Sequence, residues 1–175
     1  MDALSTVVEF RACNYDQHVR RVRGTTRLLL ESLAKTSSPY DLTASHIETI
    51  SNISTIHDIG KIAVPDSILA KTEKLSPAEN EILRAHTLKG AEIIERLHLS
   101  RESGFYRYCY DTCRFLHERW DGSGYPDGLK GDEIPIWAQA VSLADEYDWL
   151  VSGRAGMAPY LHQEAMNKML TGECG

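Results

Sequence analysis

The chain has 175 residues, of which 42% are hydrophobic and 25% are charged, and its formal net charge at pH 7 is −6. This composition is typical of one soluble domain with a sizeable core, and the negative charge argues against general affinity for the DNA backbone. Because the sequence has neither an apolar run long enough to span a bilayer nor a basic leader, we expect a cytoplasmic protein with no membrane partner.

Helical periodicity dominates the first third of the chain. One stripe predicts a helix from Asp16, and its members are His18, Val22, Leu29 and Leu33. A second helix is predicted from about Thr43, with one face made of Ile47, Ile50, Ile53 and His57. Gly60 is expected to end that helix, and Pro65 is expected to keep the segment after it extended.

The middle of the chain carries a strong helix start. Ser76, Pro77 and Glu79 combine an N-cap, a proline at the first helical position and a capping box. Thr87 is expected to cap the next helix. Further helices are predicted over Tyr106–His117, Trp137–Val151 and Tyr160–Leu170. Because no strand pattern is present, the predicted fold is all-α, a bundle of six or more helices.

Several ionisable side chains lie on or beside the apolar faces of separate predicted helices. They are His18, His57, His86, His117 and Asp145. A single buried histidine is usually a hydrogen-bonded core residue, but five such groups are costly to bury unless they compensate one another. We therefore expect them to converge on a centre where imidazole and carboxylate groups bind Zn, Fe, Mn, Ni or Co. Asp58 follows His57 directly and is able to bridge two metals with its two oxygens.

A glycine-rich stretch, Phe115–Gly131, follows the helix that carries His117. Its turn dipeptides are Asp121-Gly122, Ser123-Gly124 and Asp127-Gly128. Four glycines and Pro126 are unsuited to a packed helix, so we predict a shaped loop that covers the pocket.

These motifs resemble the HD-GYP family, the branch of the HD metal-dependent phosphohydrolases that hydrolyses cyclic di-GMP. The matching text is HDIGK from His57, HTLKG from His86, HERWDGSGYP from His117 and the acidic motif ADEYD from Ala144. The similarity runs from about Gln17 to Met169. It implies an HD-domain helical bundle with a Gly-rich GYP loop, and residues 1–175 are expected to form a single domain, whole or as a fragment of a longer regulator.

The resemblance also implies a metal site and a substrate. It implies one or two divalent transition metal ions per chain, of Fe, Mn, Zn or Ni. The ligands of one metal would be His18, His57, Asp58 and Asp145, and those of the other would be Asp58, His86 and His117. The catalytic residues would be Asp58 and Lys61, and the substrate-binding residues would be Lys61, Gly124, Tyr125, Pro126 and Arg154.

The implied partners are a cyclic dinucleotide substrate, a GGDEF-domain or other regulator protein, and a second copy of the chain in a homodimer. The loop would either line the substrate or dock the regulator. Its Trp120 and Tyr125 are expected either to stack on a guanine base or to pack against the bundle.

Three departures from the family pattern bear on activity. Leu116 stands where the family has a histidine, so the second metal would lose one protein ligand. Asn14 stands where members with a third metal carry a glutamate, so we expect no third metal. The segment after Arg154 lacks the Tyr and the Lys or Arg that are often found there, which removes phosphate contacts.

The intact and the altered motif positions leave two main interpretations of the function. The first is a metal-dependent phosphodiesterase that hydrolyses cyclic di-GMP with a metal-activated hydroxide. The alternative is a degenerate HD-GYP signalling module that binds metal or nucleotide weakly and acts through protein–protein contacts. An HD hydrolase for another phosphoester is a third interpretation, which the complete GYP loop disfavours.

Some residues near the motifs have structural interpretations. We expect Glu118 and Arg119 to form a surface or loop-bracing ion pair, with a catalytic role as the alternative. Asp148 lies three residues after Asp145 and is expected either to hold a ligand histidine or to cap a helix. Asp121 is expected to form a turn, with a role as a ligand as the alternative. The expected state of Cys109 and Cys113 is buried and reduced, with half a zinc site as the alternative.

Overall fold

The computed structural model describes residues 17–36, 39–153 and 158–172, and over these ranges the chain is helical and contains no strand. The α-helices are α2 His18–Leu33, α3 Ala44–Ile53, α4 Asp66–Leu69, α5 Pro77–Arg84, α6 His86–Arg96, α7 Gly104–Phe115, α8 Ile136–Ser152 and α9 His162–Thr171. Short 3₁₀ turns cover Ser54–Ile56, Ile59–Ala63 and Gly131–Glu133. The prediction of an all-α bundle is confirmed. No helix in the described ranges has the length and apolar character needed to cross a membrane.

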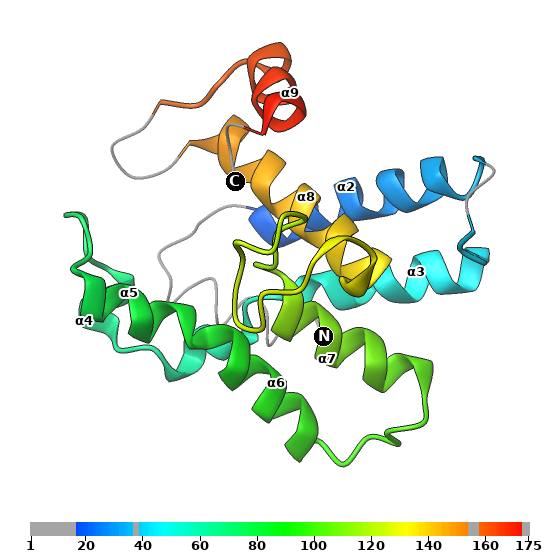
Figure 1. The fold of residues 1–175 in the computed structure, drawn as a ribbon, viewed down its shortest axis with the longest axis horizontal. Coiled ribbons are helices and arrows are strands. Elements are labelled where there is room, and N and C mark those ends of the chain that lie inside the picture. The colour runs from blue at the N-terminus through cyan, green and yellow to red at the C-terminus, as the bar shows by residue number, and fades with distance from the viewer. Residues whose placement is uncertain (1–16, 37–38, 154–157, 173–175) are drawn as a thin grey trace.

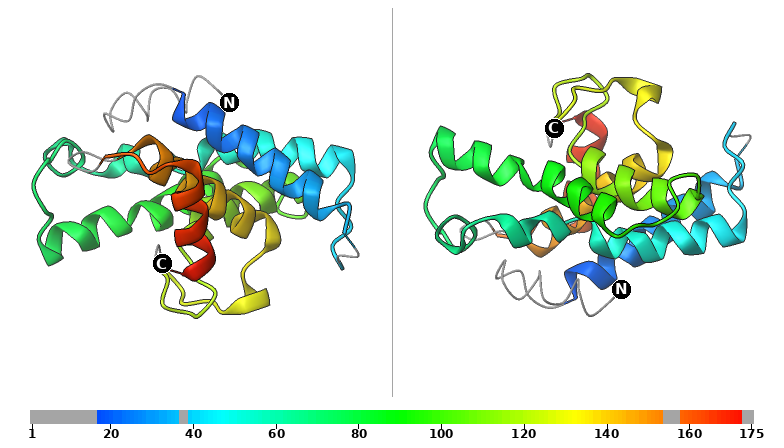
Figure 2. Two further views of the ribbon diagram at one scale, coloured as in Figure 1. Left: turned by 90° about the horizontal axis from the view of Figure 1, so that it is seen from above. Right: turned by 90° about the horizontal axis from the view of Figure 1, so that it is seen from below.

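Two groups of helices pack on either side of a short central segment, residues 54–63. On one side α2 packs between α8 and α3, and on the other side α6 packs against α7 (Figure 1). The central segment contacts α2 and α7 through its first 3₁₀ turn and α6 through its second. Figure 2 shows α9 beside α8, the helix on which it packs. The residues of the central segment therefore face both halves of the bundle.

The core consists of three apolar clusters. One joins the end of α3 and the central segment to α6 and α7 and contains Ile53, Ile56, Ile59, Ile94, Cys109 and Cys113. A second joins α2, the end of α7 and α8 and contains Val22, Leu116, Val141 and Ala144. A third contains Leu30, Ile47, Ile50 and Ala140. Because each cluster ties together helices that are distant in sequence, burial of these side chains fixes the relative positions of the helices that carry the polar residues.

The predicted stripe on the first helix is partly wrong. The buried residues of α2 are His18, Val22, Thr26 and Leu30, whereas Leu29 is 36% exposed. A constant spacing of four keeps side chains on one face of a helix, and Leu29 lies one residue away from that row. The polar Thr26 interrupts the apolar pattern of the buried row. Apolar residues alone therefore point to the neighbouring Leu29 and Leu33 instead.

Gly60 has a different role from the predicted helix stop. The helix α3 ends at Ile53, and Gly60 lies within the second 3₁₀ turn. A Cβ at Gly60 would overlap the carbonyl oxygen of His86 and lie 2.5 Å from the nitrogen of Gly90. Glycine is therefore needed here because the central segment and α6 touch through their backbones.

Two other local predictions are wrong and one is confirmed. Pro65 does not keep the next segment extended, because it directly precedes the short helix α4. Thr87 does not cap α6; its hydroxyl donates to the Arg84 carbonyl oxygen of the preceding helix. At α5, Ser76 and Glu79 form the predicted capping box.

The backbone contact at Gly60 predicts a large loss of stability for Gly60→Ala. The added methyl group has no space, so the free energy of unfolding should fall by about 3 kcal/mol or more. The matched control is Gly24→Ala, because Gly24 lies within α2 and a Cβ there meets nothing within 4 Å. This control should raise stability by about 0.5–1 kcal/mol. Urea unfolding measures both, and equal stability of the two variants would contradict this role of Gly60.

Candidate metal centre

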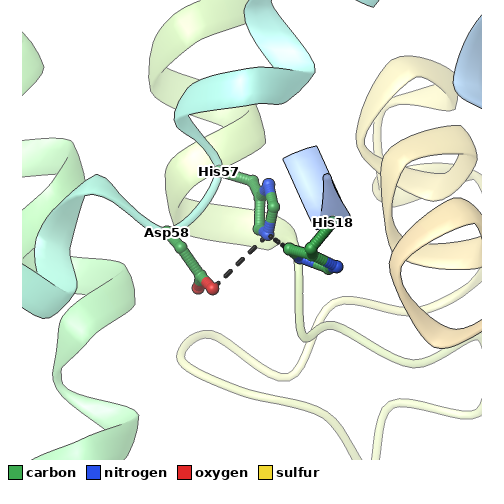
Figure 3. Close-up of side chains that lie close together, drawn as sticks. All are labelled: His18, His57 and Asp58. Atoms are coloured by element: carbon green, nitrogen blue, oxygen red, sulfur yellow. Dashed lines mark hydrogen bonds and ion pairs between the residues drawn. The ribbon is translucent and has the colours of Figure 1, made fainter. Parts of the chain in front are cut away.

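The central segment places His57 and Asp58 next to each other at the middle of the bundle. His57 follows the first 3₁₀ turn, and Asp58 precedes the second. The Nδ1 of His57 donates to the Ser54 carbonyl oxygen at 2.7 Å. This bond fixes the ring, so that Nε2 lies 3.4 Å from Asp58 Oδ2 and 3.5 Å from His18 Nε2. In Figure 3 the rings of His57 and His18 meet at these nitrogens, and the Asp58 carboxylate lies beside them.

A first group of ligand atoms comes from α2, the central segment and α8. His18, His57 and Asp58 each offer one atom, and these atoms all lie within 4.8 Å of one another. The Oδ1 of Asp145 lies 3.4 Å from His18 Nε2 and 3.8 Å from His57 Nε2. The four residues predicted for one metal are thus brought together.

A second group shares Asp58 with the first. Asp58, His86 and His117 offer ligand atoms within 4.8 Å of one another. The Nε2 of His86 lies 3.5 Å from Asp58 Oδ1, and its Nδ1 donates to the Leu83 carbonyl oxygen at 2.6 Å. The rings of His86 and His117 meet edge to face, with centroids 5.1 Å apart. The structure therefore also brings together the residues predicted for a second metal.

Asp148 contacts His18 at Nδ1, the ring nitrogen opposite the one that lies near Asp145. Its Oδ2 lies 2.7 Å from His18 Nδ1, and its Oδ1 accepts from the Nε of Arg21 at 2.5 Å. Burial favours the neutral acid, but hydrogen bonds from His18 and Arg21 outweigh burial and lower the pKa of Asp148. Of the two predicted roles for Asp148, the structure shows contact with a candidate ligand histidine. Carboxylates commonly orient metal-binding imidazoles in this way.

The histidines of the two ligand groups differ in the direction of their pKa shifts. Burial opposes a charge on His57, but the carboxylates of Asp58 and Asp145 outweigh it and raise the pKa of His57 to about 9. Burial also opposes the charge of Asp58, yet Lys61 and His57 lower its pKa well below the usual value. Burial lowers the pKa of both His86 and His117. The imidazoles beside Asp58 in the second group are thus in the neutral form that binds metals.

The donor set fits a divalent metal. Asp58 Oδ1, His86 Nε2 and Asp145 Oδ1 are buried and make no hydrogen bond with any described residue. Leaving three such atoms without a partner is costly. A cation bound by nitrogen and oxygen donors compensates this cost, and these are donors that transition metals accept.

The loop after α7 is built around the buried carboxylate of Glu118. Glu118 accepts from the backbone N–H groups of Asp127 at 2.7 Å and Leu129 at 2.9 Å. The predicted ion pair with Arg119 is wrong, because the Arg119 guanidinium lies 3.9 Å from Glu146 instead. The N–H groups of the loop satisfy the Glu118 carboxylate, so it braces the loop although no cationic side chain among the described residues pairs with it. Asp121 forms the predicted turn, accepting from the Ser123 N–H at 2.8 Å.

The loop places Tyr125 against the second group. The Tyr125 ring stacks on the His117 ring, with centroids 5.0 Å apart and an interplanar angle of 19°. At Gly124 the loop crosses itself closely, and a Cβ there would lie 2.5 Å from the Glu118 Cα. The Tyr125–Pro126 bond is cis. Burial raises the pKa of Tyr125 to about 12, so its hydroxyl group keeps its proton.

The remaining predicted site residues are placed as follows. The Nζ of Lys61 lies 2.5 Å from Asp58 Oδ2. Leu116 is buried in the apolar cluster with Val22, Val141 and Ala144. Arg154 and Asn14 lie outside the described residues.

Trp120 lies in the loop, and Cys109 and Cys113 lie in the core. Trp120 is 63% exposed. Cys109 and Cys113 are buried and form no disulfide, as predicted.

Sequence reasoning missed two arginines at this centre. Arg21 contacts Asp148, and its position three residues after His18 on the same helix could have indicated it. Arg84 lies over the ring of Tyr125, with its guanidinium carbon 4.9 Å from the ring centroid. This pairing joins α5 to the loop, and no short-range pattern in the sequence indicates it.

Comparison with known proteins gives one family and several relatives. The family model described as HD domain matches residues 12–173. A Vibrio cholerae protein named probable cyclic di-GMP phosphodiesterase is 37% identical over 175 residues, which cover 97% of this chain and 39% of that protein. A cyclic di-GMP phosphodiesterase of Thermotoga maritima is 34% identical over 169 residues, covering 97% and 43%.

A third relative acts on a related nucleotide. The 3'3'-cGAMP-specific phosphodiesterase 2 of Vibrio cholerae is 35% identical over 167 residues, covering 95% of this chain and 30% of that protein. This chain therefore spans less than half the length of each of these three relatives.

The contact between Asp148 and His18 predicts a loss of metal affinity for Asp148→Leu, a substitution that cannot accept a hydrogen bond. The affinity for Mn²⁺ or Zn²⁺, measured by competition with a chelating dye, should fall about 10–100-fold. Arg21→Met is the control that removes the other partner of Asp148 and leaves the His18 contact in place. It should change affinity much less, and an equal loss in both variants would contradict the orienting role of Asp148.

Proposed function

The chain belongs to the HD-domain family, in the HD-GYP branch that its motifs indicate, and from this premise we propose that it is the hydrolytic part of a metal-dependent cyclic-dinucleotide phosphodiesterase. The names of its relatives support this class of substrate, since one is named a cyclic di-GMP phosphodiesterase, one a probable cyclic di-GMP phosphodiesterase and one a 3'3'-cGAMP-specific phosphodiesterase. Cyclic di-GMP is the substrate we propose first.

One observation carries the proposal, namely the position of Asp58 between two groups of imidazoles. Its Oδ2 lies 3.4 Å from His57 Nε2, and its Oδ1 lies 3.5 Å from His86 Nε2. The two oxygens of one carboxylate thus face separate ligand groups. This arrangement suits a carboxylate that bridges two metal ions, here chosen from Fe, Mn, Zn and Ni.

Divalent ions held by these residues would polarise a phosphoryl oxygen and activate water for attack on phosphorus. Lys61 brings a positive charge to Asp58, where it can stabilise negative charge that develops on a phosphate. The buried thiols are unsuited to act as nucleophiles, because burial raises the pKa of Cys109 to about 12. In the proposed reaction activated water would attack phosphorus directly, so no covalent intermediate on the protein is needed.

On the substrate side we propose Lys61, Gly124, Tyr125, Pro126 and Arg154. Tyr125 supports this assignment because it already stacks on His117, one of the proposed ligands. The predicted GGDEF-domain or regulator partner and the homodimer stay predictions.

A specific observation favours a second candidate, a degenerate module that binds metal or nucleotide weakly and acts through protein contacts. Leu116 is 1% exposed and packs with Val22, Val141 and Ala144. A leucine in this apolar cluster supplies no donor atom, so the second ligand group has Asp58, His86 and His117 alone among the described residues. Lower occupancy of that group would weaken catalysis.

The bridging role predicts that Asp58→Ala abolishes hydrolysis of cyclic di-GMP. Both ligand groups lose an oxygen at once, so kcat/KM should fall by at least about 10²-fold in protein loaded with Mn²⁺. Asp132→Ala is the control, because Asp132 is an exposed carboxylate whose described contact is the Tyr40 hydroxyl at 3.5 Å. Chromatography of the nucleotide products measures the rates. Activity surviving in Asp58→Ala would refute the bridge, and an inactive but nucleotide-binding wild type would favour the second candidate.

A further inference from the structure

Four cationic side chains of the described residues lie around the centre, and they differ in their partners. They are Arg21, Lys61, Arg84 and Arg119. Arg21 pairs with Asp148, Lys61 pairs with Asp58, and Arg119 lies near Glu146. Arg84 is the exception, since no carboxylate of the described residues lies within 4.0 Å of it. An unpaired guanidinium beside a site for an anionic substrate is available to bind that anion.

A series of ring contacts connects Arg84 to the second group of ligand atoms. Its guanidinium carbon lies 4.9 Å from the centroid of Tyr125. Tyr125 stacks on His117 at 5.0 Å, and His117 offers a ligand atom within 4.8 Å of those of Asp58 and His86. Arg84 thus lies two ring contacts away from His117, whose ligand atom lies within 4.8 Å of one of Asp58, the carboxylate proposed to bridge the metals. Its position is set by the end of α5, because Arg84 is the last residue of that helix and Ala85 alone separates it from the proposed ligand His86.

Arg84 has two structural roles, and neither uses its N–H donors in a hydrogen bond to a described residue. As a cation in the last turn of α5 it stabilises the helix dipole, and it contributes a cation–π contact that stabilises the position of Tyr125. The guanidinium is planar and carries five N–H donors. They are arranged in a fork that matches two oxygens of a phosphate.

We propose that Arg84 binds the second, non-reacting phosphodiester of a cyclic dinucleotide and thereby sets the preference for a substrate with two phosphates. This inference rests on the proposed function. A cyclic dinucleotide carries two phosphodiesters in one ring, and while one is held at Asp58 and Lys61 the other must lie nearby. The chain has a net charge of −6, so a doubly anionic substrate needs local positive charge to bind.

The test compares Arg84→Met and Arg84→Lys with wild type. Methionine keeps an apolar stem over Tyr125 but removes the charge, whereas lysine keeps the charge and loses the fork. Arg96→Met is the control, because it makes the same change of charge in α6, at an arginine paired with Glu92. Kinetics are measured on Mn²⁺-loaded protein with cyclic di-GMP and with bis(p-nitrophenyl) phosphate, which has one phosphodiester. Equilibrium binding of cyclic di-GMP is measured on loaded and metal-free protein, and thermal unfolding shows that each variant folds.

With cyclic di-GMP, Arg84→Met should raise KM and the dissociation constant about 10–100-fold and leave kcat within about threefold. Arg84→Lys should give an intermediate value, and Arg96→Met should give none of these changes. Hydrolysis of bis(p-nitrophenyl) phosphate should stay within about twofold of wild type in every variant. A structural role alone would lower kcat for both substrates equally, and that result would overturn the inference.

The binding measurement separates this inference from the proposed function. If wild type binds cyclic di-GMP without hydrolysing it, the proposed function fails, and the same loss of binding in Arg84→Met still supports Arg84 as the phosphate contact. Unchanged binding in Arg84→Met would overturn the inference even in an active enzyme. Absence of both binding and hydrolysis in wild type would overturn the inference and the proposed function together.

Discussion

Burial of several ionisable groups at one point is the constraint on which this structure depends. His18, His57, His86 and Asp145 come from separate elements, and each would be costly to bury alone. They are brought together around Asp58, whose pKa Lys61 and His57 keep low despite its burial. Atoms of this group still lack hydrogen-bond partners among the described residues. The bundle therefore places a set of donor atoms around a point where a bound cation would compensate the cost of burying them.

The geometry of this centre follows from the irregular segment between α3 and α4. In a regular helix the adjacent His57 and Asp58 would point about 100° apart. The two 3₁₀ turns let both side chains face the same centre, and Gly60 lets the segment lie against the backbone of α6. His86 is thereby brought close to Asp58. A local departure from helical geometry thus connects the two halves of the bundle.

The fold class and the residues that converge on Asp58 could be predicted from the sequence. The contacts that hold these residues in place could not. Histidines on apolar stripes indicated the centre because burying isolated ionisable groups is costly. Gly60 was misread because a close approach to α6 depends on tertiary packing. Glu118 was assigned an ion pair, whereas its partners are backbone N–H groups that only the folded loop brings together. The contact of Arg84 with Tyr125 joins residues that lie far apart in sequence, so local pattern could not show it.

The two ligand groups are unequal, since the first has Asp145 nearby and the second borders a cluster in which Leu116 is buried. The metal content of the purified chain tests most directly whether the convergence on Asp58 is a metal centre. Elemental analysis at neutral pH should find at least about one transition metal per chain, since imidazole and carboxylate ligands compete well for such ions. Less than about 0.2 metal per chain after incubation with Mn²⁺, Fe²⁺, Zn²⁺ or Ni²⁺ would contradict the account.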